Sequence, residues 1–209
     1  MKEAQENKTK KELQKTLAQM RQRAEQNHTP ILREKTQEKL IELVRQIKPQ
    51  KVLEIGTAIG YSALLFLSNS GAHVYSVDIN EQSQAQAKEV INRLGYGGRA
   101  TFLLGDAAEI IPKSLGKYDT VFLDGAKSQY YLLLPYLIDM LTVGGALIAD
   151  NVLYMGLTRQ AHLLPNSHKH ITIARNLAAF LKALEEDERL QTRIYDIEEG
   201  LSCSIKIKD

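Results

Sequence analysis

The 209-residue sequence predicts an α/β fold: a mostly parallel sheet of seven strands with helices on both faces. From Lys51 onward, short apolar segments alternate with segments of helical periodicity, which is typical of parallel strands covered by helices. The last two apolar segments follow each other with no helical segment between them, which predicts an antiparallel hairpin at the end of the chain. Two more helices are expected before the first strand.

Each element follows from its own apolar pattern. Residues 1–27 carry apolar side chains at helical spacing, and a second helix is expected to begin with Thr29 as N-cap and Pro30 at its first position, and to end at Pro49. Strands are predicted at residues 52–55, 73–79, 100–104, 120–123, 146–149, 191–197 and 202–207. Helices are predicted at residues 61–67, 81–94, 131–141 and 171–184. We therefore expect a basic helical cap at residues 1–50 and one α/β domain at residues 51–209.

Charge is distributed unevenly along the chain. Residues 1–51 contain 13 Lys and Arg against 7 Glu, whereas the rest contains 14 against 18 acidic residues, so the net charge of +2 hides a basic N-terminal segment. Such a segment indicates either a polyanionic partner or a solvated pair of amphipathic helices.

Composition excludes secreted, membrane-spanning and disulfide-framework proteins. The apolar runs are far shorter than a membrane span, and the first residues lack the apolar core of a secretory signal. The single cysteine, Cys203, cannot form an internal disulfide and is expected to be buried in a strand. We therefore expect a cytoplasmic protein with no membrane partner.

The ends of the first three strands are candidates for binding an adenosine. Gly56 and Gly60 would let a ligand approach the backbone, although a tight turn alone also explains them, and the loop lacks the dehydrogenase, P-loop and serine-hydrolase patterns. Asp78 lies 22 residues after Gly56, where a carboxylate can accept both hydroxyls of a ribose. Asp106 could accept the amino group of an adenine or cap the next helix.

The ends of the fourth and fifth strands are candidates for binding a metal. Asp124 follows one strand, and Asp150 and Asn151 follow the other. Each alone could be a helix cap, but three oxygen ligands at one edge of the sheet suit Mg²⁺, with Mn²⁺ or Ca²⁺ as further candidates. In contrast, His162, His168 and His170 lie in a polar loop and are expected to be exposed to solvent rather than to bind zinc.

From Lys51 to its end the chain resembles metal-dependent class I S-adenosylmethionine O-methyltransferases of the catechol and caffeoyl-CoA type. The resemblance rests on residues 52–56 and 60–62, on Asp78, and on the residues at the ends of the fourth and fifth strands, which are Asp124, Lys127, Tyr130, Asp150 and Asn151. It implies a Rossmann-like fold, with residues 51–209 as the methyltransferase domain and S-adenosylmethionine as the methyl donor. It also implies that Asp124, Asp150 and Asn151 bind the metal and that Lys127 is the catalytic base. The cofactor site would then be lined by Glu54, Gly56, Ser62, Asp78, Asp106 and Asp124.

Within that family, residues 126–130, 151–156 and 172–175 resemble bacterial tRNA 5-hydroxyuridine methyltransferases, although Asn176 replaces a second arginine after Arg175. This implies that Mg²⁺ assists methylation of the wobble 5-hydroxyuridine to 5-methoxyuridine, with the tRNA anticodon loop as partner, and a homodimer. Basic side chains would contact the RNA phosphates, namely Lys8, Lys10, Lys11, Lys15, Arg21 and Arg23.

Two alternatives remain open. The first is a methyltransferase for small catechols or for acceptors like caffeoyl-CoA, in which the N-terminal helix is a lid or a dimer contact. Catechols and 5-hydroxyuridine both present two vicinal oxygens, so the metal ligands alone do not separate them. The second is a cofactor-binding protein without turnover, which the intact set of Asp124, Lys127, Asp150 and Asn151 disfavours.

Overall fold

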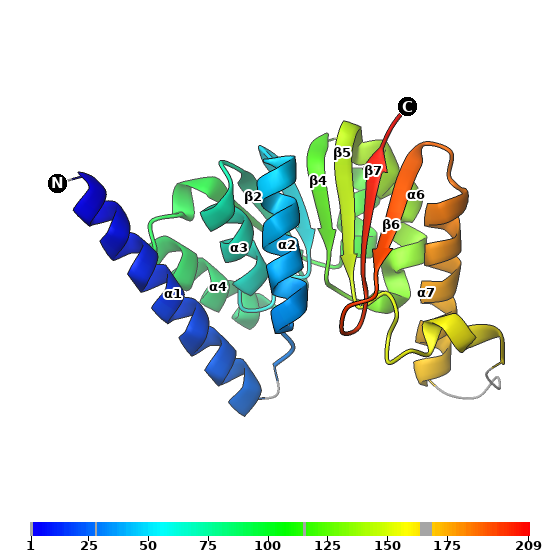
Figure 1. Cartoon of the computed structure of the whole chain (residues 1–209), viewed down its shortest axis with the longest axis horizontal. Coiled ribbons are helices and arrows are strands. Elements are labelled where there is room, and N and C mark those ends of the chain that lie inside the picture. The colour runs from blue at the N-terminus through cyan, green and yellow to red at the C-terminus, as the bar shows by residue number, and fades with distance from the viewer. Residues whose placement is uncertain (1, 28, 115, 164–168) are drawn as a thin grey trace.

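The structure, a computed structural model, describes residues 2–27, 29–114, 116–163 and 169–209. Its strands are β1 (Lys51–Ile55), β2 (His73–Asp78), β3 (Ala100–Leu104), β4 (Tyr118–Leu123), β5 (Leu141–Asp150), β6 (Leu190–Tyr195) and β7 (Leu201–Lys206). They form one sheet in the order β3-β2-β1-β4-β5-β7-β6, in which β1 to β5 pair in parallel and β7 is antiparallel to both neighbours. The predicted fold class is therefore confirmed (Figure 1).

Helices cover both faces of the sheet. The α-helices are α1 (Lys2–Gln26), α2 (Glu34–Ile47), α3 (Tyr61–Asn69), α4 (Glu81–Arg93), α5 (Ala107–Ile110), α6 (Tyr130–Met140) and α7 (Lys169–Glu186). Short 3₁₀ helices are η1 (Gly97–Arg99), η2 (Ile111–Lys113), η3 (Lys127–Gln129) and η4 (Thr158–Leu163).

The buried side chains form two layers, one on each face. Alternate strand residues point to opposite faces, so Val52 packs with α2, α3 and α4, whereas Leu53 packs with α5, α6 and α7. Helix α1 lies outside the first layer and contributes Met20 to it. Cys203 is buried on β7 as expected, and burial raises the pKa of its thiol to about 11. No helix in the described part of the chain is both long and apolar enough to cross a membrane.

The predicted start of the second helix at Thr29 and Pro30 is wrong. The backbone N–H of Thr29 donates to the carbonyl of Ala24 (2.8 Å), so Thr29 belongs to the end of α1. Residues 29–33 contain no helix, and Leu32 within them is 1% exposed. Burial of this side chain therefore places the connection against the core before α2 begins.

Helix α2 is capped by a residue distant in sequence. Its N-cap residue Arg33 makes no side-chain capping bond, but a carboxylate oxygen of Glu198 accepts from the N–H of Thr36 (2.9 Å) and from its hydroxyl (2.8 Å). The other oxygen accepts from the N–H of Lys35 (3.3 Å). The turn between β6 and β7 thus supplies the cap, which local sequence cannot reveal.

Candidate active site

The loop from Gly56 to Gly60 connects β1 to α3 at the carboxyl edge of the parallel strands. Strand order reverses beside β1, and such a position is where open α/β sheets bind ligands. Gly56 has a φ of +103°, and a Cβ there would lie 2.4 Å from the carbonyl oxygen of Asp124. Gly56 therefore lets the ends of β1 and β4 approach each other closely.

Glu54 and Ser62 are buried beneath this loop. The Ser62 hydroxyl donates to one carboxylate oxygen of Glu54 (2.5 Å), and the Ser76 hydroxyl donates to the other. Burial raises the pKa of Glu54 to about 7, against the opposing effect of the two hydroxyls. Neither Glu54 nor Ser62 lines the cavity that opens at the ends of β1 to β4, so their predicted contact with the cofactor stays a prediction.

A cavity of about 220 Å³ opens at the ends of β1 to β4. Three of the predicted cofactor residues line it, Gly56, Asp78 and Asp106. The sequence did not single out two other lining residues. Ile79, 71% exposed, offers an apolar surface, and the Gln129 amide donates to Asp106 (3.0 Å). Ile79 directly follows Asp78, the acidic residue at the end of β2, and this position could have marked it as a candidate cofactor contact.

Asp78 and Asp106 both accept backbone hydrogen bonds. Asp78 accepts from the N–H groups of Ala58 and Asn80 (both 2.8 Å), which ties the glycine loop to β2. Asn80, not Asp78, caps α4. Asp106 caps α5 through the N–H of Ala108 (2.8 Å), so the capping alternative is confirmed for Asp106. Each carboxylate still has lone pairs for a ligand, and the cofactor roles stay predictions.

The ends of β4 and β5 bring the three predicted metal ligands together. Leu123 and Ala149 are register partners, and Asp124 and Asp150 directly follow them on strands that lie about 4.8 Å apart. Burial and the charge of Asp150 raise the pKa of Asp124 well above its ordinary value. Burial likewise raises the pKa of Asp150 to about 6, although the Asn151 N–H donates to its carboxylate (2.7 Å).

This donor set fits a hard divalent cation. Asp150 is buried and Asp124 half-buried at neighbouring strand ends, and neither forms an ion pair with another residue that the structure describes. Asn151 has a φ of +57°, a conformation that Asn tolerates better than most residues. In the described part of the chain, no three His, Cys, Asp or Glu side chains form a cluster that could hold a metal ion. The predicted set contains only two carboxylates, and its third donor is the amide oxygen of Asn151.

Tyr130 links the two strand ends. Its hydroxyl lies 3.0 Å from the carbonyl oxygen of Leu123 and 3.3 Å from that of Asp150. The side chain is 1% exposed and packs edge-on against Phe180. Tyr130 thereby holds the backbone before Asp124 and at Asp150 in a fixed relation.

Lys127 lies on η3, between β4 and α6, where its charge lowers the pKa of both Asp124 and Asp150. The predicted base therefore lies near the predicted metal ligands. Asn176, which departs from the family pattern, donates its amide to the carbonyl of Ser128 (3.4 Å) and so supports η3.

Hydrogen bonds connect the segment after β5 to α7 and to the turn between β6 and β7. His170 is exposed as predicted, but it lies in the first turn of α7 and not in a loop, and its Nδ1 lies 2.7 Å from the hydroxyl of Tyr154. His168 and the side chain of His162 lie outside the described residues. Glu199 accepts from the backbone N–H of Met155 and forms an ion pair with Arg33 (2.9 Å). This pair joins the segment to the beginning of α2.

The chain is similar in sequence to proteins named as O-methyltransferases. The model of a family described as O-methyltransferase matches residues 4–207. The chain is 29% identical to a caffeoyl-CoA O-methyltransferase of Petroselinum crispum over 175 residues, which cover 79% of this chain and 72% of the relative. It is 33% identical to the catechol O-methyltransferase of Bos taurus over 123 residues, 54% of this chain and 45% of the relative.

Solved structures share the fold. A Staphylococcus aureus protein with a suggested caffeoyl-CoA O-methyltransferase activity superposes with a TM-score of 0.82 at 29% identity, over 91% of each chain. A Podospora anserina methyltransferase bound to S-adenosylhomocysteine superposes with a TM-score of 0.74 at 25% identity, over 86% of this chain and 80% of that chain.

Proposed function

Because the chain belongs to the S-adenosylmethionine-dependent O-methyltransferase family of the caffeoyl-CoA and catechol type, we propose that its acceptor is a small molecule with two adjacent oxygens. The proposal includes a divalent cation, Mg²⁺ or Mn²⁺, bound by Asp124, Asp150 and Asn151. The observation that carries it is the pair of carboxylates, Asp150 buried and Asp124 half-buried, at the neighbouring ends of β4 and β5, where the hydroxyl of Tyr130 bonds backbone carbonyls of both strands.

Lys127 is the group that takes the proton from the acceptor hydroxyl. A bound divalent cation would lower the pKa of that hydroxyl and orient both oxygens toward the methyl donor. Lys127 acts on the same hydroxyl as general base, since it lies on η3 beside the residues that would hold the cation.

The cavity at the ends of β1 to β4 would hold the methyl donor. Asp78 would accept from the ribose hydroxyls with the lone pairs that Ala58 and Asn80 leave open. Ile79 would offer an apolar surface to the adenine, and Asp106, already hydrogen-bonded to Gln129, would accept from its amino group.

A small acceptor has more support than the wobble uridine of tRNA. The relatives named above are, by name, enzymes for caffeoyl-CoA and catechol. Of the basic side chains expected to contact tRNA, Lys10 lines a groove together with Asn69, the last residue of α3, whereas the glycine loop lies at the other end of that helix. Arg21 is engaged with Gln37 (2.7 Å) and Tyr61 (3.0 Å). The tRNA substrate, the homodimer and the cytoplasmic location stay predictions.

The test is methyl transfer from labelled S-adenosylmethionine to three acceptors in parallel: a simple catechol, caffeoyl-CoA and tRNA that carries 5-hydroxyuridine. Each reaction is run with Mg²⁺ and with EDTA. We expect label on the catechol or on caffeoyl-CoA, its loss with EDTA, and its recovery when excess Mg²⁺ is added. Label on tRNA alone would mean that the acceptor is the tRNA nucleoside and not a small molecule. Transfer unaffected by EDTA would refute the role of the cation.

A further inference from the structure

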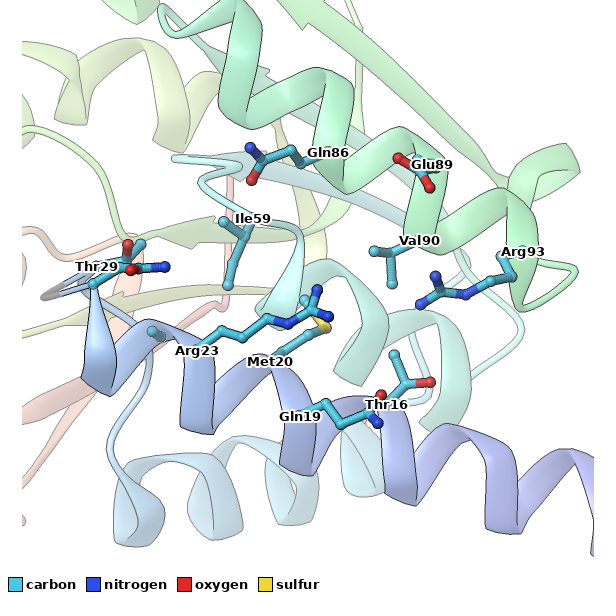
Figure 2. Close-up of a pocket in the computed structure, with 12 residues that line it drawn as sticks. Thr16, Gln19, Met20, Arg23, Thr29, Ile59, Gln86, Glu89, Val90 and Arg93 are labelled. Carbon is cyan, nitrogen blue, oxygen red and sulfur yellow. The ribbon is translucent and has the colours of Figure 1, made fainter.

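A second cavity, of about 420 Å³, lies between α1, α4 and the glycine loop (Figure 2). This volume is within the range of about 300–1,000 Å³ found for small-molecule sites. None of its lining residues belongs to the cofactor cavity, but the same loop borders both, with Gly56 in the cofactor cavity and Ile59 here. The proposed methyl transfer assigns no role to this second cavity.

Two arginines reach into it from opposite sides. Figure 2 shows Arg23 extending from α1 and Arg93 from α4 into the space between the helices. Every other arginine of the chain has a hydrogen-bond, ion-pair or ring partner, whereas none is found for Arg23 or Arg93 among the residues that the structure describes. Two guanidinium groups without a carboxylate partner make this space attractive to an anion.

Further polar side chains of the cavity also lack partners within the described ranges. Gln19 and Asn27 line the cavity from α1 and the residue after it, and Gln86 and Glu89 line it from α4. None of these four side chains has a hydrogen bond to another described residue. All four side chains are exposed, so their polar atoms are accessible to a ligand from solvent. Unused donors around the two arginines suit the oxygens of a phosphate, and Glu89 suits a hydroxyl on the same molecule.

Apolar side chains form the remaining wall. Met20, Ile59 and Val90 line the cavity between the polar groups. They would contact an apolar or aromatic body attached to the anion. We propose that this cavity binds a small phosphomonoester, with its phosphate between Arg23 and Arg93 and its organic part against Met20, Ile59 and Val90.

Calorimetric titration of the full-length protein with phenyl phosphate tests the proposal. S-adenosylhomocysteine is present throughout, so that the cofactor cavity is filled, and benzyl alcohol is the uncharged comparison. We expect saturable binding of phenyl phosphate that weakens as salt is raised, and none of benzyl alcohol. Competition with coenzyme A then separates two sources of the phosphate. If coenzyme A displaces phenyl phosphate, the natural ligand is a CoA-linked acceptor; if it does not, the ligand is a free phosphomonoester.

The arginines are tested by the double variant Arg23→Gln, Arg93→Gln, with Lys15→Gln, Lys88→Gln as matched control on the same two helices. Lys15 and Lys88 are exposed and do not line the cavity. We expect the arginine variant to bind phenyl phosphate at least about tenfold more weakly, and the control to bind like wild type. No binding by wild type, equal weakening in both variants, or binding only of an RNA oligonucleotide would overturn the proposal.

Discussion

Glu54 shows how a single buried carboxyl makes stability depend on pH. Its side chain is 0% exposed, and burial raises its pKa from 4.5 to about 7. The folded state therefore holds a proton that the unfolded state releases between these two values. The contribution of Glu54 to stability is full below pH 4.5 and is lost as pH rises through about 7.

Replacing Glu54 by Gln removes this titration. Across the window the stability of wild type relative to Glu54→Gln should fall by about 3 kcal/mol, because one pKa unit corresponds to about 1.4 kcal/mol. Chemical denaturation of both proteins from pH 4.5 to pH 8, without metal or cofactor, measures this difference. The exposed Glu185→Gln serves as control and should show no such trend. A difference independent of pH would contradict the assignment.

Lys127 carries the chemical step in this account. Lys127→Met should lower kcat by about 100-fold or more, because a general base contributes about 10²–10⁴ to rate. The affinity for S-adenosylhomocysteine should stay within a factor of about two, since Lys127 is not among the lining residues of the cofactor cavity. Steady-state kinetics and calorimetry separate the two effects. A variant with near-normal kcat would exclude Lys127 as the base.

At the scale of elements, the start of α2 depends on the turn between β6 and β7. Hydrogen bonds from Thr36 and Lys35 lower the pKa of Glu198 on balance, although its burial opposes them. The stabilisation by Glu198 is therefore present above the ordinary pKa of a glutamate and is lost as pH falls through the lower, folded-state value.

Glu198→Ala should destabilise the protein by about 1 kcal/mol at neutral pH, as expected for loss of a helix cap. Denaturant unfolding measures this loss. Glu188→Ala is the matched control: Glu188 forms an exposed ion pair with Lys208, and its removal should change stability little. Equal effects of the two substitutions would mean that Glu198 does not cap α2.

Tyr130 connects β4 and β5 at the site. Tyr130→Phe keeps the ring but removes the hydroxyl that bonds the carbonyls of Leu123 and Asp150, and the expected loss of stability is about 1–2 kcal/mol. Because the hydroxyl holds the ends of both strands, the variant should also bind Mn²⁺ more weakly than wild type. Unfolding and metal titration test both effects. Unchanged metal affinity would show that packing alone aligns the strand ends.

At the scale of the whole molecule, the sheet and the place of the site were predictable from sequence. The strands are apolar and bounded by turns, and the carboxyl ends of parallel strands meet at one edge, so Asp124, Asp150 and Asn151 could be assigned to one position. The bounds of helix α5 and the 3₁₀ helices were not predicted, because three to six residues are too few to show a helical period; for α5 only a possible cap, Asp106, was named.

Features built from distant segments could not be predicted. The cap of α2 comes from Glu198, a residue 162 positions from Thr36. Thr29 and Pro30 have the local sequence pattern of a helix start, but tertiary packing places the start of α2 later in the chain. The cavity between α1 and α4 likewise combines three separate segments, and the sequence of each one alone predicts only a solvated helix face or a turn. The division of the chain at residue 50 stays a prediction.

A comparison of catechol with phenol as methyl acceptors, at saturating S-adenosylmethionine and Mg²⁺, tests whether a cation at the ends of β4 and β5 orients the acceptor. The two molecules differ by one oxygen, the one that a cation bound by Asp124, Asp150 and Asn151 would use to orient the acceptor. We predict that wild type methylates catechol at least about 100-fold faster than phenol, and that Asp150→Asn loses this preference. Equal rates on the two acceptors, or an undiminished catechol rate in Asp150→Asn, would contradict the account.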